Sequence, residues 1–143
     1  MMKFETPNYR SSRWHQLVEL RREVLRKPLG LDFSVEDLES ESDCLFMCAV
    51  HQDQVVGTLQ YRILDSETVK MCQVAVHPDL QGSGVGAALV KKSEVWMRSL
   101  GYSQIVLHAR ESAVAFYLKL GYSLVGEPFV EVGIPHRKMS RTL

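Results

Sequence analysis

The sequence lacks an excess of charge of either sign. Seventeen lysines and arginines are balanced by seventeen aspartates and glutamates among 143 residues, so the formal net charge is zero. Proteins that hold DNA, RNA or anionic lipid by general electrostatic attraction carry a surplus of positive charge. We therefore expect no nucleic-acid partner, although a local basic patch is compatible with this balance.

A long hydrophobic run is also missing. Leu45–Val50 is typical of the apolar segments, and it is far shorter than the ~20 residues that a membrane-spanning helix needs. Residues 1–7 have no apolar core of the kind found in signal peptides. These absences predict a soluble, cytoplasmic protein with no membrane partner.

Cysteine is scarce and does not form a metal-binding pattern. Cys44, Cys48 and Cys72 are odd in number and contain no Cys-x-x-Cys pair. Cys44, Cys48 and His51 could be imagined as metal ligands, but a zinc site needs a fourth ligand and a second close pair. The alternative is buried cysteine in a strand, where free cysteine is often found. We expect neither a metal site nor a disulfide scaffold.

The remaining composition is that of an ordinary globular protein. Hydrophobic residues make up 45% of the chain and charged residues 24%. The length suits one domain, and we found no internal repeat or low-complexity segment. The sequence therefore predicts a single domain over residues 1–143.

Apolar spacing changes along the chain between helical and strand periods. Residues 9–26 show helical spacing, and Ser34–Asp37 has the form of a capping box that opens a second, short helix. A third helix begins at the glycine-rich segment 81–86, with Val85, Leu89, Ser93, Trp96 and Leu100 as its expected inner face. A fourth helix covers 113–120, with Ser112 as its expected cap. Strands are expected at 45–51, 55–64, 68–76, 105–109, 122–132 and 136–142.

This order, βααβββαβαββ, predicts an α/β fold with a mixed, mostly antiparallel sheet flanked by helices. The strand, helix and strand between residues 70 and 110 suggest one parallel crossover within it.

The glycine-rich segment Gln81–Gly86 is the part of the sequence that points to chemistry. It follows a strand and supplies the first turn of a helix, where unpaired backbone N–H groups and the helix dipole favour a phosphate. No Lys-Ser/Thr pair follows the glycines, so it is not a Walker A loop. Gly82, Gly84 and Ala87 do match the dinucleotide pattern GxGxxA. However, five residues separate strand from glycine, and the remaining chain is too short for a doubly wound sheet.

Residues 74–86, Val-Ala-Val-His-Pro-Asp-Leu-Gln-Gly-Ser-Gly-Val-Gly, resemble the coenzyme A-binding segment of the GNAT family of N-acetyltransferases. Gln81, Gly84 and Gly86 occupy the defining positions of its Gln/Arg-x-x-Gly-x-Gly/Ala pattern. Residues 113–122, Ala-Val-Ala-Phe-Tyr-Leu-Lys-Leu-Gly-Tyr, resemble a second family element at the usual distance. The segments 24–30 and 129–139 are similar to a small bacterial subgroup that includes ElaA- and YjcF-like proteins.

The resemblance implies that acetyl-CoA is the cosubstrate and that its pyrophosphate lies on the glycine segment. The pantetheine arm would pair with the preceding strand, as an added β-strand does, and backbone N–H groups there would donate to the thioester oxygen. Arg110 stands where many members have Asn, so it either contacts the cofactor or faces solvent. The implied cofactor-binding residues are Val74, Ala75, Val76, Gln81, Gly82, Ser83, Gly84, Val85, Gly86 and Arg110.

Tyr117 matches the family's usual general acid, which protonates the departing thiolate of coenzyme A. By spacing alone, Tyr117 could simply belong to a buried helix face. Near Lys70, some members carry a general-base Glu, and a protonated lysine cannot take that role. The base stays open among Glu131, His136, Glu67, His108 and a water chain, while His77 is expected to be a loop residue.

Two basic groups have alternative interpretations. Lys91 and Lys92 either meet an outer phosphate of the cofactor or lie on a solvated helix face. A second group lies where the family builds its acceptor site. It could attract an acidic acceptor, and a solvated helix face explains it equally well. This second group is Arg21, Arg22, Arg26 and Lys27.

The resulting hypothesis is transfer of an acetyl group from acetyl-CoA to a primary amine by direct attack in a ternary complex. The acceptor is a small molecule or a peptide, and a homodimer is an option because dimers are common in the family. The alternative is a non-catalytic acyl-CoA sensor or partner-binding module, which would account for the missing base and for Arg110.

Overall fold

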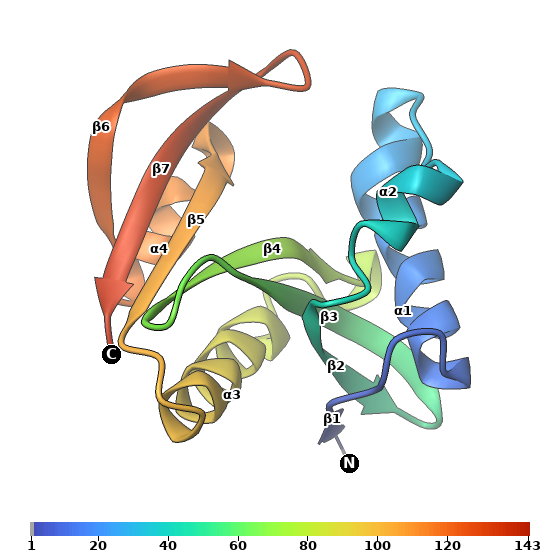
Figure 1. Ribbon diagram of the computed structural model, residues 1–143. Helices are drawn as coiled ribbons and strands as arrows, with labels where there is room; N and C mark the ends of the chain where they lie inside the picture. The colour runs from blue at the N-terminus through green and yellow to red at the C-terminus, as the bar shows by residue number, and fades with distance from the viewer. Residues whose placement is uncertain (1) are drawn as a thin grey trace.

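A mixed sheet runs through the molecule, and its apolar strands are covered by helices on both faces (Figure 1). The computed structural model describes residues 2–143, which contain seven strands in the order β1-β2-β3-β4-β5-β7-β6. Neighbouring strands in these residues are antiparallel except β4 and β5, which run parallel. The predicted parallel crossover is therefore confirmed. The strands are β1 (Met2–Glu5), β2 (Leu45–His51), β3 (Gln54–Ile63), β4 (Thr68–Val76), β5 (Gln104–Arg110), β6 (Ser123–Glu131) and β7 (Ile134–Thr142).

The helices form two layers. On one face, α1 buries Trp14, Leu17 and Val18 against the β2 side chains that point to that face of the sheet. On the other face, α3 and α4 pack over a larger core that includes Leu89 and Tyr117. None of the helices in residues 2–143 is long and apolar enough to cross a membrane. The helices are α1 (Ser12–Arg21), α2 (Val35–Glu39), α3 (Val85–Ser99) and α4 (Val114–Lys119).

The predicted first helix begins and ends for local reasons. The Ser11 hydroxyl accepts the Trp14 N–H at 3.2 Å, so α1 begins at Ser12 rather than at residue 9. After Arg21 the backbone widens into one π-helical turn over Arg22–Arg26, followed by a 3₁₀ turn that ends at Gly30 in the left-handed region. The predicted capping box at Ser34 is present, with Asp37 as its reciprocal partner.

Two helix predictions were wrong in detail. Leu100 is 50% exposed and Trp96 only half-buried, because α3 turns Glu94 and Met97 inward instead. The buried Glu94 accepts a hydrogen bond from the Tyr122 hydroxyl at 2.7 Å, which makes its burial tolerable. Ser112 does not cap α4, because it lies within a preceding 3₁₀ turn.

β4 and β5 separate half-way along their length. Their pairing runs from Thr68↔Gln104 to Met71↔Leu107 and does not continue. Next to this point β4 carries a bulge: the single β3 residue Leu59 lies opposite two β4 residues, Gln73 and Val74, and Gln73 has a positive φ of 54°. The bulge bends β4 away from β5, and the sheet opens in a V that Figure 1 shows between the two strands.

Candidate functional site

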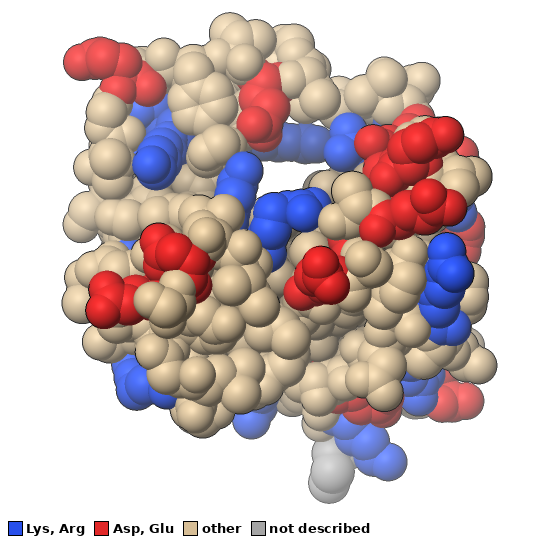
Figure 2. All heavy atoms as spheres, in the orientation of Figure 1, with Lys and Arg blue, Asp and Glu red and all other residues tan. Residues whose placement is uncertain are grey.

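The V-shaped opening leads into a cleft of about 400 Å³. Its walls come from β3, β4 and β5, the π-helical turn after α1, α4 and the β6–β7 turn. Figure 2 shows a hollow between the β6–β7 hairpin and the α2 side of the molecule, bordered largely by basic side chains. Concave sites of this size hold small molecules or parts of them.

The glycine segment lies beyond the open end of β4 and has the backbone geometry of an anion site. Gly82 and Gly84 have φ values of 82° and 93°, which side-chain-bearing residues rarely adopt. A Cβ on either would meet no atom within 4 Å, so the surface above this segment is open. The first turn of α3 contains no acidic side chain, and its first intrahelical bond runs from Ala88 to Gly84. The amides of residues 85–87 therefore point outward without helical partners, which suits a phosphate group.

Gln81 and Gly86 connect this segment to the strand before it. The Gln81 side-chain amide donates to the Val76 carbonyl at 3.1 Å, which closes the loop onto the end of β4. A Cβ at Gly86 would lie 3.4 Å from the Phe116 ring and 3.5 Å from Val76. Gly86 thus lets α3 start close to both β4 and α4.

The strand edge beside this segment is open. On one side Ala75 and Val76 pair with Thr58 and Gly57 of β3. On the other side β5 has already diverged after Met71. An extended chain can therefore add to residues 74–76 as another strand does.

Tyr117 reaches the cleft from the α4 side. Its side chain is 6% exposed and packs edge-on against Phe116 and Tyr122, with ring centroids 5.0 and 5.7 Å apart. Within residues 2–143 the structure gives its hydroxyl no hydrogen-bond partner. Burial raises the pKa of Tyr117 above that of a free phenol, and the nearby Cys72 adds to the effect. The hydroxyl therefore stays protonated at physiological pH.

Cys72 is a cleft residue that the sequence analysis did not single out. It follows the last β4–β5 pair, and its thiol lies 3.4 Å from the Lys70 carbonyl. Burial raises the pKa of the Cys72 thiol, which disfavours the nucleophilic thiolate. Cys44 and Cys48 are free and buried, and they lie outside the cleft; Cys48 is in β2 as expected, whereas Cys44 lies just before that strand. The part of the chain that the structure describes holds no cluster of three or more potential metal ligands.

Three of the candidate bases meet in the cleft wall. His108 Nδ1 lies 3.1 Å from Glu131 Oε1, and His136 Nε2 lies 3.7 Å from the other oxygen. His136 Nδ1 contacts the Ile134 carbonyl at 2.7 Å, so it carries the proton. Because the Glu131 carboxylate likewise accepts from His108 Nδ1, the Nε2 lone pair of His108 stays available in the neutral state, whereas His136 Nε2 faces that carboxylate.

The fourth candidate base lies elsewhere. Glu67 is in the β3–β4 turn, where its carbonyl accepts the N–H groups of Ser103 and Gln104, and it does not reach the cleft. His77 is a loop residue as predicted: its Nδ1 accepts the Asp79 N–H at 3.1 Å. Two signals in the sequence could have grouped His108 with His136. One is the alternation of apolar and polar residues in β5, and the other is the histidine that directly follows Pro135.

The structure separates the members of the two basic groups that the sequence suggested. Arg110 lines the cleft and donates to the Leu25 carbonyl at 3.4 Å across it. Arg22 and Lys27 form ion pairs with surface carboxylates, whereas Arg26 lines the cleft. Lys92 lies over the Phe4 ring at 5.0 Å, on the β1 side of α3, and Lys91 is exposed.

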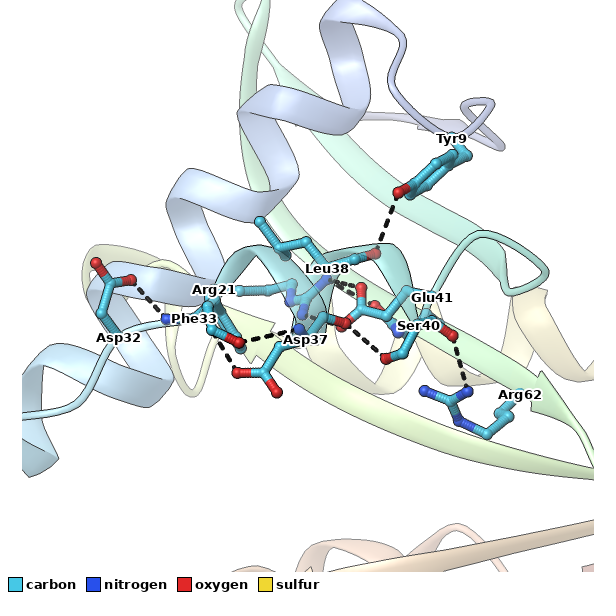
Figure 3. A network of polar contacts seen from close by, with 11 residues as sticks. Tyr9, Arg21, Asp32, Phe33, Asp37, Leu38, Ser40, Glu41 and Arg62 are labelled. Atoms are coloured by element: carbon cyan, nitrogen blue, oxygen red, sulfur yellow. Dashed lines mark hydrogen bonds and ion pairs between the residues drawn. The ribbon is translucent and has the colours of Figure 1, made fainter.

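Arg21 is fully buried, so the interpretation of this residue as part of a solvated face was wrong. Its guanidinium donates to both oxygens of Glu41 at 2.8 and 2.7 Å and to the Gln60 side chain at 2.8 Å. Phe33 covers it at 4.5 Å from the ring centroid. Figure 3 shows this network between α1, the α2–β2 loop and the sheet. Glu41 and Gln60 form part of the cleft floor, so the network fixes that floor in place.

Comparison with known proteins agrees with this geometry. Residues 14–122 match the profile of the Acetyltransferase (GNAT) family. The chain is 30% identical over 125 residues to the uncharacterized N-acetyltransferase YjcF of Bacillus subtilis, which covers 85% of this chain and 87% of YjcF.

Two solved structures share the fold. Escherichia coli ElaA is 25% identical with a TM-score of 0.83 over 99% of both chains. A GNAT acetyltransferase from Elizabethkingia anophelis, solved with acetyl-CoA bound, is 16% identical with a TM-score of 0.78 over 99% of this chain and 98% of that one. The predicted GNAT-type fold and the similarity to ElaA- and YjcF-like proteins are thus confirmed, and the chain belongs to the GNAT family of acetyltransferases.

Proposed function

We propose that the protein transfers an acetyl group from acetyl-CoA to a primary amine by direct attack in a ternary complex. The observation that carries this proposal is the separation of β4 from β5 after Met71 and Leu107. The separation leaves an open strand edge that runs from a cleft with ionisable side chains to a segment of exposed amides. A long cofactor with a phosphate end and a thioester end matches that layout.

Bound acetyl-CoA would supply an activated acetyl thioester. The free amides at the end of the glycine segment, residues 85–87, would hold its pyrophosphate, with Gln81 fixing the segment to β4. The free edge of residues 74–76 would pair with the pantetheine amides and donate to the thioester oxygen as negative charge develops. Arg110 would then act at the acceptor end of the cleft instead of on the phosphates, because it binds the Leu25 carbonyl.

Tyr117 is proposed as the general acid that protonates the leaving thiolate. Its hydroxyl is in the cleft, and its raised pKa keeps the proton in place until a strong base develops beside it. Burial against two aromatic rings also fixes its orientation. The position of Tyr117 in the cleft wall is what supports a role beyond filling the core.

His108 is proposed as the general base that takes the proton from the attacking amine. Glu131 holds His108 in the tautomer with Nε2 free, and the same carboxylate would stabilise the imidazolium that forms. His108 is the first β5 residue beyond the last β4 pair, which places it at the apex of the opening. A candidate base in the cleft weakens the sensor alternative, which depended on the lack of one.

Direct attack is favoured over an acyl-cysteine route. Cys72 is the cysteine in the cleft wall, and burial keeps its thiol protonated. The acceptor amine can itself serve as the nucleophile once it is deprotonated and positioned.

The proposal is tested by calorimetric titration with acetyl-CoA, followed by detection of coenzyme A release with a panel of amines. We expect micromolar binding that Gly84→Val abolishes, since valine at φ 93° distorts the segment. Gly101→Val is the matched control: its glycine has a φ of 95° and open surroundings, but it lies past the far end of α3. A folded protein that binds no acetyl-CoA would overturn the proposal. Binding without release of coenzyme A would instead favour the sensor.

A further inference from the structure

Four cationic side chains face the cleft without a carboxylate partner. None of the ion pairs found within residues 2–143 involves Arg26, Arg62, Lys70 or Arg110, although all four line the cleft. Arg62 and Arg110 donate only to the backbone carbonyls of Ser40 and Leu25. The cleft therefore contains several positive charges in a protein whose net charge is zero.

The acidic residues in the cleft wall do not pair with these cations. Glu41 is bound through both oxygens by the buried Arg21. Glu131 accepts a hydrogen bond from His108 Nδ1 and lies beside His136. Each carboxylate thus already has its own partners, and the four cations remain available to a ligand.

The cations are placed in a way that the fold alone does not favour. Arg62 and Lys70 are direct partners across the β3–β4 pair, so their side chains leave the same face of the sheet. Like charges in that relation destabilise a sheet. Arg26 adds a guanidinium whose Nε is buried without a hydrogen-bond partner. An anion bound between these groups would remove the repulsion and satisfy free donors.

The phosphates of acetyl-CoA do not explain this charge. The exposed amides that suit a pyrophosphate are at residues 85–87, which are absent from the cleft wall. The part of coenzyme A that would lie along residues 74–76 is the uncharged pantetheine arm. An anion at Arg62 and Lys70 must therefore belong to the acceptor.

We propose that the acceptor is a small primary amine that also carries an anionic group, a carboxylate or a phosphate. This inference rests on the proposed function. Lys70 and Arg62 hold the anion, and Arg26 and Arg110 extend the positive field toward the amine. The same field lowers the pKa of an entering ammonium group, because nearby positive charge disfavours the protonated form. One set of side chains thus selects the acceptor and favours its reactive state.

The test compares matched amines in the coenzyme A release assay. We expect kcat/KM for β-alanine to exceed that for β-alaninamide, and that for 2-aminoethyl phosphate to exceed that for ethanolamine. The first pair reports on a carboxylate and the second on a phosphate. 1,3-Diaminopropane, which carries a second positive charge, should be the poorest acceptor. The advantage of the anionic amines should shrink as salt is added.

Variants then locate the anion site. Lys70→Gln should raise KM for the anionic amine by roughly tenfold to a hundredfold, the usual effect of one lost charge-assisted hydrogen bond, with little change in kcat. KM for the matched neutral amine should barely change. Lys3→Gln removes an exposed lysine of β1, outside the cleft, and serves as the control. Arg62→Gln should repeat the effect, which protects the result against misfolding of one variant.

Two kinds of failure are distinguishable. If acetyl-CoA binds and neutral or cationic amines react as well as anionic ones, the acceptor inference is wrong while the acetyltransferase proposal stands. Equal selectivity in Lys70→Gln and the unchanged protein would also overturn it. If no amine releases coenzyme A, the proposed function itself fails.

Discussion

Tyr117 shows how one side chain can belong to the core and to the site together. Its ring packs in the apolar cluster over β5, while its hydroxyl lines the cleft. Helical spacing predicts the first property, and only the second distinguishes a proton donor from a core residue. A substitution that removes the hydroxyl and keeps the ring separates them.

Tyr117→Phe should lower kcat by about 10²–10⁴-fold, the usual range for loss of a general acid, and leave the Kd for acetyl-CoA nearly unchanged. Because burial raises the pKa of Tyr117, ionisation of this group should not limit the rate below about pH 10. Steady-state kinetics across pH and calorimetry provide the two readouts. Tyr102→Phe, outside the cleft, is the control. Full kcat in Tyr117→Phe would refute the assignment.

His108→Gln should lower kcat by a similar factor, because glutamine keeps a polar side chain but cannot accept a proton. Added imidazole should restore part of the rate if the missing function is proton transfer. His51→Gln, at the end of β2 and outside the cleft, should leave kcat unchanged. Loss of rate in His108→Gln without rescue, together with loss of acetyl-CoA binding, would point to a structural role.

At this scale the sequence singled out candidate site residues only where a motif was present, and their roles stay predictions. Gln81–Gly86 and Tyr117 were found from the motif, and they occupy positions that suit their proposed roles. Arg62 and Lys70 were not assigned to an acceptor site, because their juxtaposition depends on the β3–β4 register. Arg21 was misjudged since its partner Glu41 is 20 residues away and supplied by a loop.

Between elements, the Arg21 network takes the place of apolar packing. It joins α1 to the α2–β2 loop and to β3 through three hydrogen bonds. A buried ion pair contributes little net stability over an apolar replacement, but loss of one partner leaves an uncompensated charge. Removal of one partner should therefore cost much more stability than replacement of both partners by apolar residues.

Glu41→Gln should lower the free energy of unfolding by about 3–5 kcal/mol, and the double variant Arg21→Met with Glu41→Leu should lose less. Urea unfolding of both variants measures this difference. Glu39→Gln, on the exposed surface of α2, is a control that should change stability by less than about 0.5 kcal/mol. A loss below about 1 kcal/mol in Glu41→Gln would show that the pair is not desolvated.

The β6–β7 turn carries backbone strain. Val132 and Gly133 have φ values of 46° and 73°, a combination that hairpin turns adopt readily with Asn-Gly but not with a β-branched residue. Val132→Asn should raise the free energy of unfolding by about 1 kcal/mol, and the melting temperature by about 3 °C. Val130→Asn, on the exposed side of β6, should give no gain. Equal melting temperatures for Val132→Asn and the unchanged protein would mean that the turn is unstrained.

Most elements were predictable from periodicity alone. Strands 45–51 and 68–76 have the predicted bounds, because turn residues flank clear apolar runs. The π-helical turn after α1 and the bulge at Gln73 were not predicted. Neither is marked by a residue type that signals it in the sequence, because both Arg22–Arg26 and Gln73 are ordinary helix or strand residues in composition.

At the scale of the whole molecule, two buried thiols make the free energy of unfolding depend on pH in the alkaline range. Burial raises the pKa of Cys44 to about 11 and that of Cys48 to about 12, whereas in the unfolded chain each ionises near its ordinary value. Their stabilising effect is complete below about pH 9 and is lost as pH rises through the folded pKa, because the unfolded state then binds fewer protons.

Between pH 9 and 11 the free energy of unfolding should fall by up to about 1.4 kcal/mol per pH unit for each thiol. Cys48→Ala should remove one such contribution and flatten the slope, whatever its effect on stability at pH 7. Denaturant unfolding at several pH values gives both slopes. Parallel slopes for the two proteins would show that Cys48 does not titrate as its burial implies.

The short β4–β5 contact also affects how the chain emerges during synthesis. β1 to β4 are complete at residue 76, but the strand that covers part of the β4 edge begins only at Gln104. Until the ribosome has released that later segment, the nascent sheet exposes a row of unpaired backbone groups, which invites pairing with other chains. The bulge at Gln73 bends part of that row out of line and so makes it a poorer template for aggregation.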